Sequence, residues 1–305
     1  MSTNHCPFCG SDQYSGSVYP RNYFNQKIFE YITCKQCRLI YLTPQPVQDD
    51  YMAMYPPAYQ DSQADTRIHP EPYKKLTGLR FSYGFQFDQI RQHAGPNAHI
   101  LDYGCGAGNF IANAIQQGFT CSGAEFNPAF LSILKKGIPA AFFYEITELL
   151  EGSPSPRFDV IRLSNVLEHL TDPGYVLRQL KQYLRPGGIF LIEGPVEDNF
   201  CLAKKVRTVY FGSRKFLQPR RQVSAPPYHI FLSNRRNQRD FFRKCELDEK
   251  LYRIAEDPWP FPISFSSARG SGKITALIAK FSMFLTKVFN RNWGNIFIYI
   301  GKPAA

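Results

Sequence analysis

Four of the eight cysteines stand in two close pairs, each with the spacing Cys-x-x-Cys. The pairs are Cys6/Cys9 and Cys34/Cys37, and 24 residues separate Cys9 from Cys34. Two such pairs are typical of a tetrahedral zinc site whose four thiolates leave no position open for a substrate. We therefore expect a structural zinc ion, held by a zinc ribbon within residues 1–45.

A glycine-rich turn, with glycines at positions 104, 106 and 108, lies between a predicted strand and a predicted helix. Glycines let a ligand approach the backbone closely because no side chain intervenes. Glu125, at the end of the next predicted strand, can accept hydrogen bonds from both hydroxyls of a ribose. Spacing alone permits a dinucleotide enzyme. Asp102, just before the glycines, would repel a pyrophosphate and instead favours a cationic amino-acid head or a sulfonium ligand.

The run Leu-Asp-Tyr-Gly-Cys-Gly-Ala-Gly at 101–108 closely resembles the first motif of the class I S-adenosylmethionine-dependent methyltransferases. The resemblance covers about residues 76–195. It includes Phe-Asp-Val-Ile at 158–161 and Leu-Arg-Pro-Gly-Gly at 184–188, which look like the family's fourth strand and its turn into the fifth. It implies a methyltransferase with S-adenosylmethionine as cofactor, on an α/β fold with a Rossmann-like, doubly wound, mostly parallel sheet.

The same resemblance implies cofactor contacts for particular residues. Glu125 would bind the ribose, and Phe126 would pack beside the adenine. Asn165, after the fourth strand, would lie near the methyl-bearing sulfur. Three residues would line the methionine end of the cofactor: Asp102, Gly104 and Gly106.

His169 follows Glu168 at the predicted carboxyl end of the fourth strand. A histidine beside a carboxylate there is well placed as a general base, with a hydrogen-bonded packing role as the alternative. The segment resembles that of the ubiquinone-biosynthesis O-methyltransferases, which carry Glu-x-x-Glu-His and hold a divalent cation with it. Asn165 replaces the first glutamate here. Because hard cations require several charged oxygens, we expect no catalytic metal.

A second candidate base, His229, stands beside Tyr228 in a loop that follows two prolines. Related methyltransferases of small molecules carry a similar Pro-x-His run after the fifth strand, where the substrate enters. The resemblance implies that Tyr228 and His229 contact the acceptor. Loops commonly carry such functional side chains.

The elements that must position these residues alternate along the chain. Short apolar segments predict strands, and these lie at 98–102, 120–125, 140–143, 158–163 and 188–193. Helical spacing predicts helices between them, at 110–117, 128–136 and 175–184. Strict alternation indicates a parallel sheet with helices on both faces. Residues 27–32 are predicted as a strand between the cysteine pairs. Closing elements are a helix at 274–289 and a strand at 295–300.

Composition divides the chain into three predicted parts. A zinc-binding module at 1–45 is followed by a linker at 46–75 that is rich in proline, tyrosine and glutamine. The methyltransferase domain occupies 76–305. It carries a basic insertion at about 195–253, where the alternation of strands and helices breaks.

Most of the net charge of +11 comes from this insertion, since residues 201–253 hold fourteen lysines and arginines against four acidic residues. The excess of positive charge indicates an acidic partner. The candidates are a phosphorylated or nucleotide-linked substrate, RNA and an anionic membrane surface. A solvated basic face is the alternative.

The predicted helix at 274–289 is heavily apolar, and Lys273, Lys280 and Lys287 lie on one stripe of it. It either packs on the sheet alone or also touches a lipid surface. No apolar stretch is long enough to span a bilayer, and the first residues lack the apolar run of a signal peptide. We therefore expect a cytoplasmic protein.

The leading functional hypothesis is methylation, at oxygen or carbon, of a small polar metabolite such as a sugar or nucleotide-sugar. A four-cysteine module ahead of a class I domain resembles the sugar C-methyltransferases of deoxysugar pathways, although those carry an extra C-terminal domain that 305 residues cannot hold. Two other hypotheses stay open. One is an RNA methyltransferase that uses the zinc module and the basic segment, and the other is a catalytically silent cofactor-binding protein.

Overall fold

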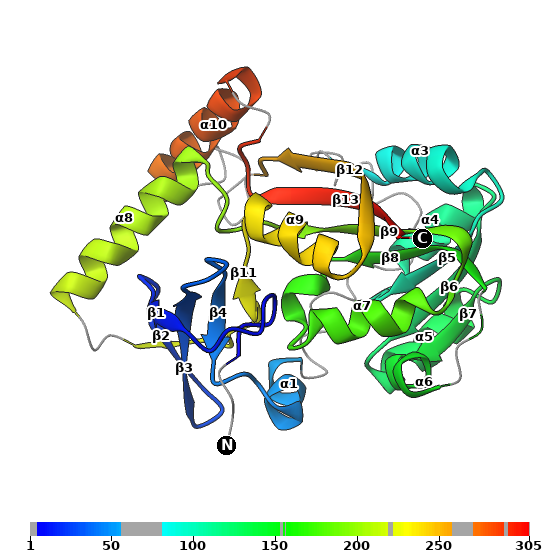
Figure 1. Ribbon diagram of the computed structural model, residues 1–305, viewed down its shortest axis with the longest axis horizontal. Helices are drawn as coiled ribbons and strands as arrows, with labels where there is room; N and C mark the ends of the chain where they lie inside the picture. Colours follow the sequence, from blue (N-terminus) through cyan, green and yellow to red (C-terminus); the bar gives the residue numbers. More distant parts are fainter. Residues whose placement is uncertain are drawn as a thin grey trace. The chain divides into compact units, whose positions relative to one another are not determined.

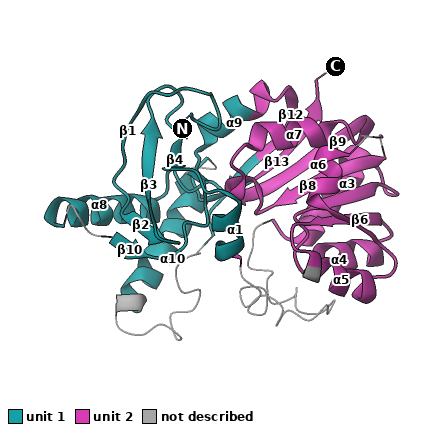
Figure 2. Ribbon diagram, turned by 90° about the horizontal axis from the view of Figure 1, so that it is seen from below, with its two compact units in different colours: residues 1–54, 195–241, 253–297 teal, residues 55–194, 242–252, 298–305 magenta. Residues whose placement is uncertain are grey.

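The computed structural model describes residues 5–55, 81–152, 155, 157–218, 222–257, 271–289 and 292–304. Its chain divides into two compact units (Figure 2). Unit 1 combines Met1–Met54, Pro195–Phe241 and Arg253–Phe297, and unit 2 combines Tyr55–Gly194, Phe242–Tyr252 and Ile298–Ala305. Residues 56–75 of the predicted linker lie outside the described residues.

A mostly parallel sheet forms the core of unit 2 (Figure 1). Among the described residues it has seven strands in the order β12-β13-β9-β8-β5-β6-β7, and β7, β6, β5, β8 and β9 pair in parallel. Their bounds are β5 His99–Tyr103, β6 Thr120–Glu125, β7 Phe142–Glu145, β8 Phe158–Ser164, β9 Leu184–Pro195, β12 Leu247–Ala255 and β13 Ile296–Pro303. The predicted α/β class is confirmed.

Helices separate the parallel strands along the chain, as the sequence predicts. They are α3 Tyr83–Ala94, α4 Asn109–Gln116, α5 Pro128–Gly137, α6 Ile146–Glu151 and α7 Pro173–Lys181, with a short 3₁₀ helix, η2, at Leu167–His169. The predicted bounds of the parallel strands and of α4, α5 and α7 agree with the structure to within four residues. The carboxyl side chain of Asp172 accepts a hydrogen bond from the Tyr175 backbone N–H at 2.8 Å. This cap, with Pro173 in the first turn, explains where α7 begins.

Unit 1 is built on a second sheet, with strand order β10-β2-β3-β4-β11 and β1 added on β3. The strands are β1 Tyr14–Gly16, β2 Arg21–Phe24, β3 Lys27–Cys34, β4 Ile40–Thr43, β10 Gln222–Ser224 and β11 Phe231–Leu232. Two of its strands, β10 and β11, come from the predicted basic insertion, and they pair with β2 and β4. The cysteine module and the basic segment therefore share one sheet.

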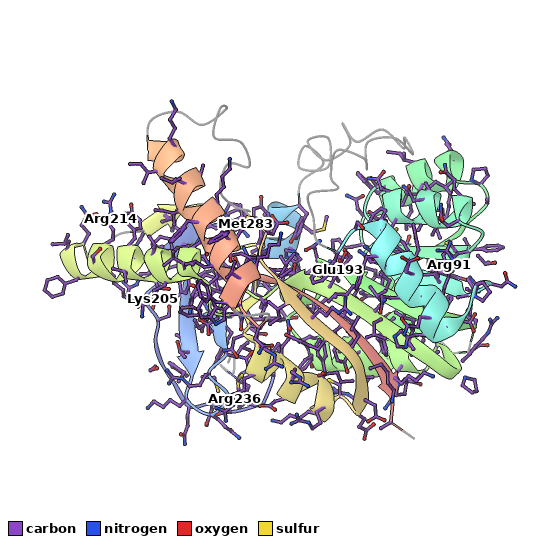
Figure 3. All side chains as sticks on the ribbon, turned by 90° about the horizontal axis from the view of Figure 1, so that it is seen from above. Arg91, Glu193, Lys205, Arg214, Arg236 and Met283 are labelled. Carbon is purple, nitrogen blue, oxygen red and sulfur yellow. The ribbon has the colours of Figure 1, made fainter. Side chains whose placement is uncertain are left out.

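Helices of unit 1 include α1 Gln48–Met54, α8 Leu202–Leu217, α10 Ser271–Phe289 and most of α9 Arg235–Lys244. The sequence analysis predicts α10 but assigns no helix to the segment of α8. The Ser282 hydroxyl of α10 accepts a hydrogen bond from the Ala203 backbone N–H of α8 at 3.0 Å, so the two helices lie against each other (Figure 3). In the described part of the chain, every helix is too short or too polar to cross a membrane.

Candidate functional site

The glycine turn after β5 adopts a backbone that side chains resist. Gly104, Gly106 and Gly108 have φ angles of +74°, +52° and +74°, in the left-handed region that glycine adopts without strain. A Cβ atom on Gly104 would lie 2.5 Å from Val166, and one on Gly108 would lie 2.6 Å from Leu134. A Cβ on Gly106 would meet no atom within 4 Å. The turn therefore leaves open space beside its central glycine, as a cofactor cradle requires.

Glu125 ends β6 directly beside this turn. Its carboxylate accepts hydrogen bonds from the backbone N–H groups of Gly106, at 2.9 Å, and Asn127, at 3.3 Å. Burial raises the pKa of Glu125, and the two N–H groups oppose that shift. A carboxylate has about four lone-pair positions, so capacity remains for ribose hydroxyls. The next residue, Phe126, keeps 40% of its surface exposed and can stack on a ligand.

Asp102 takes a different position from the other predicted cofactor residues, because its carboxylate is buried and paired inside the protein. Arg162, on β8, donates to it at 2.7 Å, and both side chains are less than 5% exposed. Burial disfavours the guanidinium charge, but Asp102 and Glu193 raise the pKa of Arg162. Removing Asp102 would take away one of the two carboxylates that balance this buried charge. Asp102 therefore pairs β5, the strand that leads into the glycine turn, with Arg162 of the neighbouring strand β8.

The sequence analysis did not identify the partners of Arg162. Besides Asp102, the guanidinium donates to Glu193 at 3.0 Å and to Gln86 at 2.8 Å, and it lies 4.0 Å from the centre of the Phe110 ring. An arginine inside the otherwise apolar strand β8 signals such a network, because a buried charge must be paired.

Asn165 follows β8 and is exposed at the carboxyl end of the strand. Its φ of +51° is left-handed, which asparagine tolerates better than most residues. The Asn165 backbone N–H donates to the carbonyl of Glu193 at 2.9 Å, so the residue is held at the end of β8. The carboxyl ends of parallel strands are where α/β sheets bind ligands. Asn165 thus shares an edge of the sheet with the glycine turn and Glu125.

His169 lies between two partners at the end of η2. Its Nδ1 atom is 3.0 Å from the Tyr55 hydroxyl, and its Nε2 atom is 3.7 Å from Oε1 of Glu168. Glu168 is only 4% exposed and packs on Gly194, where a Cβ would come within 3.1 Å of the carboxylate. Tyr55 falls in the predicted linker, and the sequence analysis did not select it.

His229 occupies a similar environment within unit 1. Its Nδ1 atom lies 2.8 Å from Oε2 of Glu197, and its backbone carbonyl accepts a 2.7 Å hydrogen bond from Tyr31. Burial raises the pKa of Tyr31, which keeps its hydroxyl protonated as a donor. Tyr228, the neighbouring candidate, is half-buried.

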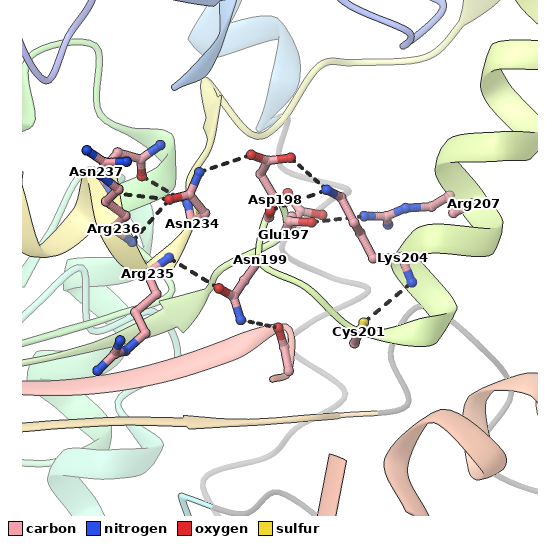
Figure 4. A network of polar contacts seen from close by, with 11 residues as sticks. Glu197, Asp198, Asn199, Cys201, Lys204, Arg207, Asn234, Arg235, Arg236 and Asn237 are labelled. Carbon is pink, nitrogen blue, oxygen red and sulfur yellow. Dashed lines mark hydrogen bonds and ion pairs between the residues drawn. The ribbon is translucent and has the colours of Figure 1, made fainter. Parts of the chain in front are cut away.

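The segment that carries Glu197 is anchored by charged and amide side chains (Figure 4). Asp198 pairs with Lys204 at 3.0 Å and accepts from the Asn234 amide at 3.1 Å. Arg207 of α8 donates to the backbone carbonyl of Glu197 at 3.5 Å. These contacts hold the chain at Glu197 and Asp198, and the Glu197 carboxylate in turn contacts His229.

The four paired cysteines converge in unit 1. The Sγ atoms of Cys6 and Cys37 are 3.5 Å apart, and those of Cys9 and Cys34 are 3.6 Å apart. All four sulfurs lie within 4.8 Å of one another. Disulfide sulfurs would be about 2.05 Å apart, whereas tetrahedral zinc with bonds of about 2.3 Å separates its sulfurs by roughly 3.8 Å. The donor set and its spacing fit a zinc ion.

Both cysteine turns have the same local geometry. The backbone N–H of Gly10 donates to the Cys6 carbonyl at 2.8 Å, and that of Arg38 donates to the Cys34 carbonyl at 3.1 Å. Gly10 and Arg38 both have a positive φ, of 75° and 63°. The hydrogen bond from the Cys6 thiol also lowers the pKa of Cys37 to about 5. Two equivalent turns thus present their sulfurs toward one point.

Comparison with known proteins agrees with this geometry. Residues 84–234 match the family model described as a methyltransferase domain. A ubiquinone biosynthesis O-methyltransferase of Escherichia coli O157:H7 is 31% identical over 125 residues, which are 39% of this chain and 50% of that protein. The chain thus spans about half the length of the curated relatives it matches.

Two solved structures are similar in fold. One is the 1,6-didemethyltoxoflavin-N1-methyltransferase of Burkholderia thailandensis, with a TM-score of 0.52 and 15% identity over 94% of this chain and all of that one. The other is a putative sarcosine dimethylglycine methyltransferase of Galdieria sulphuraria, with a TM-score of 0.51 and 14% identity over 81% of this chain and 97% of that one. Residues 84–234 therefore carry a methyltransferase domain, and the two solved structures share its fold.

Proposed function

We propose that this protein transfers the methyl group of S-adenosylmethionine to oxygen or carbon of a small polar acceptor, a sugar or a nucleotide-linked sugar. The observation that carries the methyl-transfer part is the left-handed glycine turn after β5. It leaves open space at Gly106 and has the Glu125 carboxylate beside it. The family match over residues 84–234 supports the same reaction.

Each cofactor residue has a definite role in this proposal. S-adenosylmethionine supplies an electrophilic methyl carbon when it is bound. Glu125 accepts hydrogen bonds from the ribose hydroxyls, and the exposed ring of Phe126 packs beside the adenine. Asn165, exposed at the end of β8, lies toward the methyl-bearing sulfur. Gly104 and Gly106 line the methionine end, where the missing side chains let the ligand approach.

His169 is the proposed general base. Attack by an acceptor hydroxyl or carbon releases a proton, and an imidazole near neutral pKa can take it. In this role the Nδ1–H group donates to the Tyr55 hydroxyl, which leaves the Nε2 atom to take the proton. Glu168, whose Oε1 atom lies 3.7 Å from Nε2, then stabilises the imidazolium. His229, paired with Glu197, is the second candidate, and Tyr228 beside it is proposed as an acceptor contact.

An anionic or nucleotide-linked acceptor is supported by a cavity of about 190 Å³ within unit 1. Its lining combines cations with aromatic rings, namely Tyr19, Arg21, Tyr210, Phe211, Arg214 and Lys215. Arginine and lysine suit phosphate oxygens, and aromatic faces suit a nucleobase. Burial raises the pKa of Tyr19 to about 12, so its hydroxyl stays neutral beside an anion.

The four cysteines are proposed to hold a structural zinc ion, with Cys6, Cys9, Cys34 and Cys37 as its ligands. Four thiolates complete the tetrahedron, so the ion has no open position for chemistry. Free thiols and a zinc site suit a reducing compartment. A cytoplasmic location is accordingly part of the proposal.

An acceptor screen tests the function. Purified protein is incubated with S-adenosylmethionine labelled on the methyl group and a panel of nucleotide-sugars, free sugars and RNA. We expect label on a sugar-bearing compound. Label on RNA, with affinity that falls steeply as salt rises, would replace this proposal with the RNA alternative. Cofactor binding without transfer to any acceptor would favour the silent binding protein.

The Glu125 carboxylate gives a direct test of cofactor placement. Glu125→Ala is expected to weaken S-adenosylmethionine binding about tenfold or more, since a charged hydrogen bond contributes about 1.5–3 kcal/mol. Ribose hydroxyls donate to the carboxylate, so binding favours its deprotonated form. As pH falls through the raised pKa of Glu125, wild-type affinity should therefore fall. Calorimetry across acidic pH measures both effects.

Glu125→Gln is the matched control, because it keeps the shape and cannot titrate. Its affinity should be lower than that of wild type and should not change across the same acidic range. Wild-type affinity in both variants would contradict the placement of the ribose. Asp102→Ala is less informative, because it also removes one of the two carboxylates that pair with the buried Arg162.

A further inference from the structure

α10 carries a continuous stripe of large apolar side chains on its outer side. They follow one another at intervals of three and four residues, so they lie along one face of the helix. Each is between 52% and 63% exposed, and together they are Ile274, Leu277, Phe281, Phe284 and Val288. Contiguous exposed apolar surface of this kind marks an interaction site.

The opposite side of α10 is fixed in place. It buries the small residues Ala276 and Ala279 together with two hydroxyl side chains, Ser282 and Thr286. Both hydroxyls donate to the carboxylate of Glu256, which is only 2% exposed. Rolling the helix inward to cover the apolar stripe would break these bonds and leave a buried carboxylate without its donors. The stripe is therefore held facing outward.

Three lysines border the stripe. Lys273, Lys280 and Lys287 are all exposed and recur every seven residues, so they form a row directly beside the apolar side chains. The neighbouring helix α8 adds the exposed Lys205, and neither helix contains an aspartate or glutamate. α8 also exposes apolar side chains, of which Phe216 and Leu217 are 87% and 74% exposed.

We propose that α10 docks this protein onto an anionic lipid surface. An apolar stripe bordered by cations, with no acidic residue, is the pattern of helices that lie in the membrane interface. Anionic headgroups attract the lysine row while the phenylalanines enter the acyl boundary. A second copy of this chain fits the surface poorly, since two such helices would bring like charges together. This inference does not depend on the proposed methyl transfer.

Vesicle binding tests the apolar stripe. The full chain is sedimented with vesicles of phosphatidylcholine and phosphatidylglycerol at 3:1, and with phosphatidylcholine alone. We expect binding to the anionic vesicles and at least tenfold weaker binding to the neutral ones. The variant Phe281→Ser/Phe284→Ser should bind about a hundredfold more weakly, about tenfold for each ring withdrawn from the membrane. The control Ile133→Ser/Phe142→Ser removes equally exposed side chains elsewhere and should bind as wild type does.

A lysine set tests the charge independently of the apolar side chains. Lys273→Gln/Lys280→Gln/Lys287→Gln should weaken binding to anionic vesicles about fivefold for each lysine. Lys135→Gln/Lys136→Gln/Lys244→Gln, which changes three exposed lysines elsewhere, should have little effect. Circular dichroism confirms that all variants fold. Failure of wild type to bind anionic vesicles, or equal binding by wild type and both α10 variants, would overturn the proposal. So would a dimer in solution that the phenylalanine variant dissociates.

Discussion

His169→Ala is expected to lower turnover by about 10²- to 10⁴-fold while S-adenosylmethionine affinity stays nearly unchanged. The imidazole is held between the Tyr55 hydroxyl and the Glu168 carboxylate at the end of η2, four residues beyond Asn165. A base so oriented acts only when the acceptor loses its proton, so its removal lowers kcat without weakening cofactor binding. Single-turnover rates with the acceptor found by screening, together with calorimetry, separate the two quantities.

The partners of the two histidines provide matched controls. If His169 is the base, Glu168→Gln should also reduce turnover, because this variant removes the charge that stabilises the imidazolium. If His229 is the base, His229→Ala and Glu197→Gln should each reduce turnover for the same reason. If His229→Ala and Glu197→Gln give the large losses and the first pair does not, His229 is the base. Near-normal turnover in both histidine variants would mean that the acceptor needs no histidine base.

The parallel sheet could be predicted from the sequence because local rules and burial agree there. β8 and β5 are apolar runs that are buried on both faces, and turns or helix caps separate them from the helices. The glycine turn was also predictable. Only glycine adopts the φ values found at Gly104 and Gly108 while packing against Val166 and Leu134.

What the sequence did not predict depends on contacts between distant segments. The pairing of β10 with β2 and of β11 with β4 joins residues about 190 to 200 positions apart. Pairing between such distant segments cannot be predicted from local sequence patterns. The partners of Arg162 come from three separate segments, at Gln86, Asp102 and Glu193. The sequence analysis missed α8 because the exposed face of this helix carries both basic and apolar side chains. The usual contrast between an apolar buried side and a polar exposed side is therefore weak.

Loss of the proposed zinc ion is the second large effect that we expect. Cys34 is fully buried at the end of β3, where its backbone N–H donates to the Leu39 carbonyl at 2.8 Å. Structural zinc supplies about 10–16 kcal/mol of apparent binding free energy in zinc-finger peptides. That is comparable with the total stability of a typical domain, about 5–15 kcal/mol. Cys34→Ser should therefore abolish zinc binding and unfold the sheet of unit 1, which β3 joins to β2 and β4.

Elemental analysis and thermal unfolding measure this effect together. Wild type purified without chelator should hold one zinc ion per chain, and Cys34→Ser should hold none and melt at a much lower temperature. Cys245→Ser is the matched control, because Cys245 is also buried but lies outside the four-cysteine cluster. It should keep its zinc. Absence of zinc from wild type would contradict the site. Loss of turnover on chelation while the protein stays folded would instead indicate a catalytic metal, because an ion closed by four thiolates can act only through the fold it stabilises.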